Sequence, residues 1–178
     1  IQPTLNAALP GLLKQEGFVL TAALGFMEHY KLDTKSLDEA TLRSLINNTK
    51  VPAEARAKGL DLLVERKPAD LTTFLAKVAV DPANEVAISA LNNLAKSDQK
   101  AAIAPLEAAI DSNNSERAQK GWTILTNIPG ADVDGFFVKH LGALKASTGK
   151  SASAIELIEG AKTRKDPAVA AALADFEK

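Results

Sequence analysis

Three stretches of this chain decide its fold: residues 52–63, PAEARAKGLDLL; residues 83–94, ANEVAISALNNL; and residues 114–125, NSERAQKGWTIL. They begin at positions 52, 83 and 114, a constant step of 31. An acidic residue, a small residue and a large apolar residue recur at the same places: Glu54, Glu85, Glu116; Gly59, Ala90, Gly121; Leu60, Leu91, Trp122. A fixed period of about 20 to 50 residues is typical of stacked supersecondary units.

The same step continues into a second segment of each unit. Leu75, Leu106 and Phe137 follow it, as Leu63, Leu94 and Leu125 do in the first segment. Pairing the segments predicts five two-helix units, at about residues 17–48, 52–80, 83–111, 114–146 and 151–178. We expect the step to lengthen to 33 at both ends, with Leu42 preceding Leu75 and with Ile155 and Ile158 following Trp122 and Leu125. Residues 1–16 fit no unit and predict a partial repeat or a cap.

Apolar residues recur at spacings of three and four almost everywhere, which indicates helices and no strands. The predicted helices span residues 4–15, 17–31, 37–47, 53–65, 68–80, 83–95, 99–111, 115–127, 133–146, 151–163 and 167–177. Asp81-Pro82 and Asp166-Pro167 each predict an N-cap carboxylate followed by a proline at the first helical position. Ser36-x-x-Glu39 predicts a capping box, and Lys67-Pro68 a helix stop.

Size and composition restrict the classes of function. The chain has 178 residues, 46% hydrophobic and 4% aromatic, with a formal net charge of −1, which suits one extended helical core. A near-neutral balance argues against a nucleic-acid-binding surface. The absence of cysteine excludes disulfides, thiolate metal sites and covalent haem attachment within this chain. No apolar run reaches the length of a membrane span. Because the chain begins with isoleucine, we expect a piece of a larger protein.

Two stretches resemble HEAT-like repeats of the short kind. They are Val51-Pro52-x-Glu54-x-Arg56-x-x-Gly59-Leu60 and Asp81-Pro82-x-x-Glu85-Val86-x-x-x-Ala90-Leu91. Arg56 matches the arginine frequent in the first helix of that family, whereas Ala87 and Ala118 occupy its register in the next two units. The sequence therefore predicts an all-α fold, a right-handed α-solenoid of about five HEAT-like hairpins forming a single domain over residues 1–178.

A closer resemblance covers about residues 42–178. It rests on residues 103–113, 115–122 (SERAQKGW), 128–132 and 165–169, and on the ending Ala174-Asp175-Phe176. These stretches resemble a helical region of large bacterial membrane-bound or secreted dehydrogenases of the sorbosone or sugar dehydrogenase type. In that family a β-propeller domain comes first and a cytochrome c-like haem domain last. The resemblance implies a periplasmic or envelope location, a PQQ- or haem-linked parent enzyme, and catalytic and haem-binding residues outside this segment.

Candidate chemical groups are few, and each has an ordinary structural interpretation. We interpret His140, in the register of Val78 and Ala109, as a half-buried helix side chain rather than a proton shuttle. Trp122 is expected to be a core anchor. Glu54, Glu85 and Glu116 are expected to be first-turn acids that favour the helix dipole, and the basic cluster of Lys162, Arg164 and Lys165 a solvated helix end. His29 and His140 are the two histidines, and their spacing predicts no metal site.

The expected function is that of a non-catalytic scaffold or spacer between dehydrogenase and haem domains, with protein partners and no cofactor, catalytic or metal-binding residue of its own. The second helices of the units would line the concave side of the solenoid. Lys77, Glu107 and Lys139 are the candidate contacts on that surface. Two alternatives stay open: a free-standing adaptor that binds a protein or peptide, and a bilin-lyase-like enzyme built from HEAT-like repeats.

Overall fold

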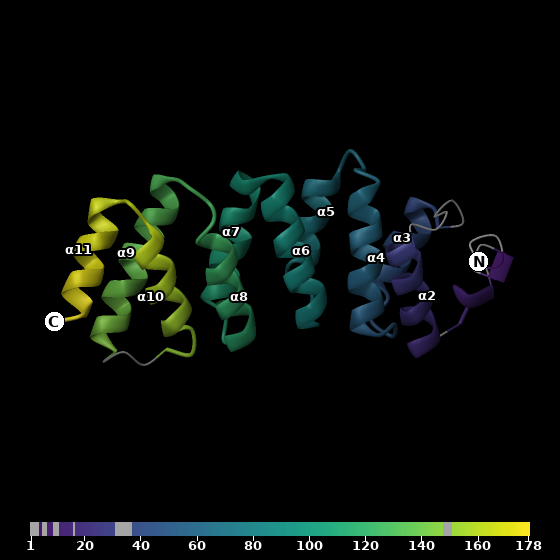
Figure 1. The fold of residues 1–178 in the computed structure, drawn as a ribbon, viewed down its shortest axis with the longest axis horizontal. Coiled ribbons are helices and arrows are strands. Elements are labelled where there is room, and N and C mark those ends of the chain that lie inside the picture. Colours follow the sequence, from purple (N-terminus) through teal and green to yellow (C-terminus); the bar gives the residue numbers. More distant parts are fainter. Residues whose placement is uncertain (1–3, 5–6, 9–10, 16, 31–36, 148–150) are drawn as a thin grey trace. The chain divides into compact units, whose positions relative to one another are not determined.

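The computed structural model describes residues 4, 7–8, 11–15, 17–30, 37–147 and 151–178, and within these residues all regular structure is helical (Figure 1). The prediction of an all-α protein is confirmed for this part of the chain. The helices are α2 (Gly17–Tyr30), α3 (Glu39–Asn47), α4 (Ala53–Glu65), α5 (Leu71–Val78), α6 (Asn84–Ser97), α7 (Gln99–Ile110), α8 (Ser115–Leu125), α9 (Ala131–Ala146), α10 (Ala154–Thr163) and α11 (Pro167–Phe176). The cap or partial repeat expected for residues 1–16 falls largely outside the described residues.

The chain divides into two compact units, Ile1–Asn93 and Leu94–Lys178. In the first unit α4 packs against both α2 and α3, and these helices lie side by side in Figure 1. In the second unit α7 packs on α8, α8 on α10, and α9 on both α10 and α11. Helix α6 begins in the first unit and ends in the second. A single domain over residues 1–178 stays a prediction.

Short polar side chains start many of the helices. Asp98, Asn114 and Asp166 each accept a hydrogen bond from a backbone N–H of the first turn of α7, α8 and α11. The Asp166-Pro167 prediction is thereby confirmed, with proline at the start of α11. At α3 the N-cap is Asp38, whose Oδ1 accepts from the Thr41 N–H at 2.7 Å. Ser36 of the predicted capping box lies outside the described residues.

Three predicted helix starts are wrong. Helix α6 begins at Asn84, because the carboxylate of Asp81 pairs with Arg56 instead of capping the helix at Pro82. Helix α5 begins at Leu71, after a turn closed by the Leu71 N–H on the Pro68 carbonyl. Helix α10 begins at Ala154 and not at residue 151. The predicted stop after α4 is confirmed, since Lys67 takes a φ of 50°.

The residues that keep the step of 31 form the core of the hairpins. All nine large residues of the repeat are buried, each with at most 1% of its surface exposed: Leu60, Leu63, Leu75, Leu91, Leu94, Leu106, Trp122, Leu125 and Phe137. The expected first-turn position of the acids Glu54, Glu85 and Glu116 is also confirmed. Within each hairpin the sequence period therefore marks which face of each helix turns inward.

The small residues of the repeat allow neighbouring helices to approach closely. A Cβ on Gly59 of α4 would lie 2.6 Å from Leu45 Cδ2 of α3. A Cβ on Gly121 of α8 would lie 2.8 Å from Ile110 Cγ1 of α7. Gly160 of α10 is tighter still, because its Cβ would meet both the Thr126 hydroxyl and the Phe137 ring. The packing reason inferred for Gly59 and Gly121 is confirmed.

The expected step of 33 into the last hairpin is wrong. Ile155, predicted to repeat Trp122, is 74% exposed. The buried residues of α10 are Leu157, Gly160 and Ala161. Gly160 and Ala161 repeat Gly121 and Trp122 at a step of 39, so the register of the last hairpin is displaced toward the C-terminus from the one that the sequence pattern suggested. The longer connection before α10 accounts for the shift.

Candidate interaction surfaces

Arg56 of α4 joins three segments of the first unit. Its side chain is 3% exposed, and its Nε donates a 2.7 Å hydrogen bond to the Ile46 carbonyl in the last turn of α3. Its two terminal nitrogens bind the two carboxylate oxygens of Asp81, which follows α5. A guanidinium suits this place because it offers a planar fork of donors to a carboxylate and further donors to a carbonyl.

Arg164 has the corresponding place in the second unit. Its side chain is 8% exposed, and its Nε donates to Asp134 Oδ1 of α9 at 2.6 Å. Its Nη1 donates to the carbonyls of Thr126 and Ile128, at 3.1 and 2.7 Å, just after α8. The last carbonyls of a helix lack intrahelical partners. Both arginines therefore supply donors to the carboxyl end of a helix in the preceding hairpin.

The sequence identified only one of these two arginines. Arg56 was recognisable from its place in a HEAT-like first helix. Arg164 was assigned to a solvated basic cluster, which is right for the exposed Lys162 and Lys165 and wrong for Arg164. An arginine directly after a helix gives no sequence signal that separates a buried cap from a solvated end.

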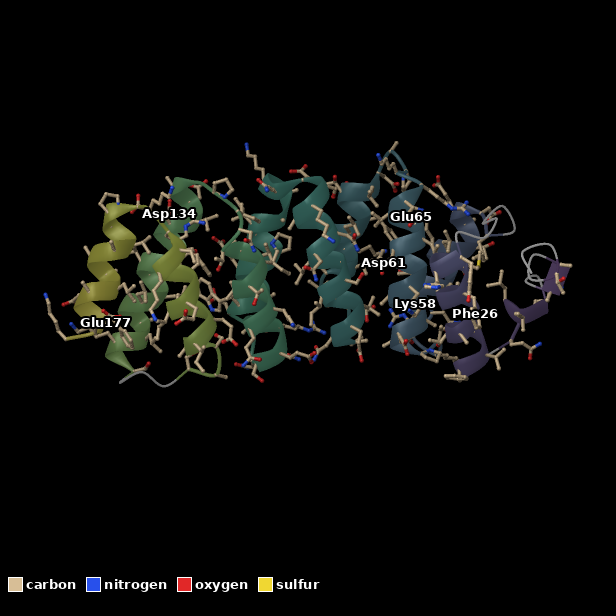
Figure 2. The ribbon with its side chains drawn as sticks, in the orientation of Figure 1. Phe26, Lys58, Asp61, Glu65, Asp134 and Glu177 are labelled. Carbon is tan, nitrogen blue, oxygen red and sulfur yellow. The ribbon has the colours of Figure 1, made fainter. Side chains whose placement is uncertain are left out.

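A row of polar and charged residues follows one face of α4. Lys58, Asp61 and Glu65 succeed one another along this helix (Figure 2). Asp61 Oδ1 accepts hydrogen bonds from Ser89 Oγ at 3.0 Å and from Asn93 Nδ2 at 2.8 Å, both on α6. These bonds connect the first helices of two successive hairpins with polar groups, whereas the core connects them with apolar ones.

His140 lies against aromatic rings in the second unit. Its ring is 4.2 Å from the centroid of Phe136 and 5.2 Å from that of Trp122, and its Nε2 is 3.2 Å from Asp111 Oδ1. Burial lowers the pKa of His140, which the Asp111 carboxylate partly offsets and Lys139 reinforces. The side chain is half-buried within the core register, so the packing interpretation is supported by its contacts.

The three candidate contacts on the expected concave surface lie on second helices. Lys77 is half-buried on α5 in the first unit. Glu107 is half-buried on α7, and Lys139 lies on α9 with its side chain 66% exposed, its Nζ 3.8 Å from Asp111 and 5.2 Å from the Phe136 ring centroid. Lys139 thus has contacts of its own, and the role of these residues in binding stays a prediction.

An open hollow of about 490 Å³ lies beside Arg164 in the second unit. Its walls come from the end of α8, the turn before α9 and the turn between α10 and α11, and include Thr126, Gly130, Asp134 and Asp166. The arginine and Asp134 neutralise each other at its edge. The hollow gathers no histidine or other base beside a nucleophile, so it suggests no reaction.

The clearest surface feature is an apolar face of α2. Phe18 is 84% exposed, and Val19, Phe26 and Tyr30 are each between 43% and 48% exposed. Phe26 and Tyr30 stack with ring centroids 6.0 Å apart. The opposite face of α2 is buried through Leu20, Thr21, Ala23, Leu24 and Met27. The continuously apolar sequence of residues 17–27 was the signal for this second face, although it predicted a helix without showing that one side stays exposed.

Comparisons of the chain with protein-family profiles, with curated proteins and with solved structures found no match. Among the described residues, no group of three histidine, aspartate or glutamate side chains is arranged to hold a metal ion. None of the described helices combines the length and apolar character that a bilayer-spanning segment needs. The interaction surfaces therefore provide the basis for a functional proposal.

Proposed function

We propose that this chain is a non-catalytic helical scaffold, a right-handed solenoid of about five HEAT-like hairpins with protein partners. The observation that carries the proposal is the shared inward register: residues 31 apart are buried at equivalent places in successive hairpins, from Leu60 to Trp122 and from Leu75 to Phe137. A hairpin cannot bury its apolar stripe alone, so equal stripes in successive hairpins favour stacking. The buried arginines support it, because each connects neighbouring hairpins.

We further propose that the scaffold is a spacer in an envelope dehydrogenase, between a β-propeller domain and a haem domain. The support is the resemblance of residues 103–132 and 165–176 to the helical region of sorbosone-type enzymes. In this role the chain sets the distance between two redox partners and holds no cofactor itself. Lys77, Glu107 and Lys139 are the proposed contacts on its concave side.

The reading frame that encodes the natural protein tests the spacer role. Sequencing outward from this segment is expected to give a β-propeller domain before it and a Cys-x-x-Cys-His haem motif after it. A gene that encodes these 178 residues alone, with a start codon directly before them, would contradict the spacer role and leave the scaffold itself standing.

The exposed face of α2 favours a second candidate, an adaptor that binds a protein or peptide. A helix that is apolar on all sides is normally buried. Phe18 and Phe26 leave one side of α2 apolar and open to solvent. An adaptor would use this face, whereas a spacer would use the groove along its second helices.

A further inference from the structure

The exposed residues of α2 form one continuous stripe. At 100° per residue, Phe18, Ala22, Phe26, Val19 and Tyr30 fall within an arc of roughly 120°. All five are apolar or aromatic, and four of them are exposed. The stripe extends from residue 18 to residue 30, a rise of roughly 18 Å along the helix. This shape corresponds to about three and a half turns of one partner helix.

We infer that this stripe binds a single amphipathic helix of a partner protein, about 12 to 14 residues long. The inference rests on the proposed function as an interaction module and names the kind of partner. The pattern of α2 itself supports it, since its inner face already packs on α4 through residues of the same kind. The outer stripe offers a second helix an equivalent surface.

The exposed area favours one helix over a second copy of the chain. The four exposed side chains offer roughly 400 Å² of mostly apolar surface, given that a whole aromatic side chain carries about 150–250 Å². A stable dimer usually buries about 800 Å² on each partner. The stripe has half of that, which suits one laid helix, and a patch of this size on a monomer is often functional.

The charge pattern favours a protein helix over a lipid surface. Helices that lie in a membrane interface carry lysine and arginine on their polar face. Residues 17–30 contain neither, and the face opposite the stripe is buried in the first unit. Lys58 of neighbouring α4 reaches Gly25 and borders the stripe (Figure 2). With so little charge on the stripe, binding should depend weakly on salt.

Fluorescence anisotropy with a labelled synthetic peptide tests the inference on the full chain. The probe is a 14-residue helix of zero net charge with leucines at one helical face, and its control has the same composition with the leucines distributed around the helix. We expect micromolar binding of the probe, at least tenfold weaker binding of the control, and less than a twofold change between about 50 and 500 mM salt.

Substitutions locate the binding. Phe18→Ser/Phe26→Ser should weaken the probe at least tenfold, whereas Val80→Ser/Ile155→Ser, at two other exposed apolar residues, should leave it within twofold. Unchanged circular dichroism shows that each variant is folded. Equal weakening by both pairs would overturn the inference. So would self-association abolished by Phe18→Ser/Phe26→Ser, or co-sedimentation with neutral phosphatidylcholine vesicles in place of peptide binding. None of these outcomes bears on the stacking of the hairpins, which solution scattering tests separately.

Discussion

The two units use a buried arginine for the same purpose, but place it at opposite ends of a helix. Arg56 lies in the first turn of α4, and Arg164 directly follows the last turn of α10. Each pairs with one aspartate and donates to carbonyls at the end of a helix in the preceding hairpin. The need to satisfy those carbonyls is common to both units, whereas the sequence position that satisfies it is not.

The difference in surroundings predicts a difference in stability, the largest effect expected here. Arg56→Met leaves Asp81 unpaired where it is 13% exposed, and we expect a loss of about 3 kcal/mol in the free energy of unfolding. Arg164→Met should lose about 2 kcal/mol, because the neighbouring hollow lets water reach Asp134 and the freed carbonyls. Urea unfolding followed by circular dichroism measures both.

Arg43→Met is the matched control for these two variants. Arg43 also binds an aspartate, Asp70, at 2.5 Å, but that carboxylate is 62% exposed. Its loss should cost about 0.5 kcal/mol. Equal losses from all three variants would contradict the importance assigned to burial. In Arg56→Met/Asp81→Leu, part of the stability should return, since no unpaired charge remains.

Glycine substitutions give the next largest contrast. Gly160→Ala places a methyl group against the Thr126 hydroxyl and the edge of the Phe137 ring, and neither can move far within the core. We expect a loss of about 2 kcal/mol from overpacking. In Gly59→Ala the methyl group meets the flexible end of Leu45, so the gain of about 1 kcal/mol in helix propensity should offset most of the strain. Thermal unfolding distinguishes them, and a larger loss at Gly59 would reverse the contrast.

The effect of pH should be confined to the second unit and should be smaller. Because burial lowers the pKa of His140 below its ordinary value of 6.5, the unfolded chain binds the proton more readily than the folded one. The free energy of unfolding should therefore fall as pH falls below about 6.5. Urea midpoints from Trp122 fluorescence between pH 8 and 5.5 measure this. His140→Gln should flatten the profile, and an unchanged slope in that variant would exclude His140 as its cause.

The smallest expected effect is a gain. Lys67 ends α4 with a φ of 50°, a conformation that glycine adopts without the steric cost of a Cβ. Lys67→Gly should raise the free energy of unfolding by about 0.5 kcal/mol, seen as a higher melting temperature. Ser147→Gly after α9, where φ is −87°, is the control and should give no gain. A loss at residue 67 would show that the lysine side chain itself contributes there.

The sequence predicted those parts of the fold that depend on a period. Leu60, Leu91 and Trp122 announced the core because apolar residues on one helical face must be buried together. It missed what depends on distance in space. Asp81 could not be known to bind Arg56 in place of capping α6, and Ile155 followed an apparent step of 33 although the longer connection moves the true register to Leu157 and Gly160.

The candidate surfaces were predicted less well than the core. Lys77, Glu107 and Lys139 were chosen by analogy with solenoids, and the sequence could not show that Lys139 approaches Asp111. The apolar face of α2 was also hidden, because a helix that is apolar all round is read as buried. Only the solvent exposure of Phe18 and Phe26 separates a surface from a core.

Small-angle X-ray scattering of the full chain tests the stacking of the hairpins most directly. A compact domain of this length has a radius of gyration of about 16 Å. Five hairpins stacked at helix spacings of about 8–10 Å extend over roughly 50 Å, so we predict a radius near 19 Å or above, with a long tail in the pair-distance distribution. A radius equal to that of the compact domain, with a symmetric distribution, would contradict the proposed solenoid.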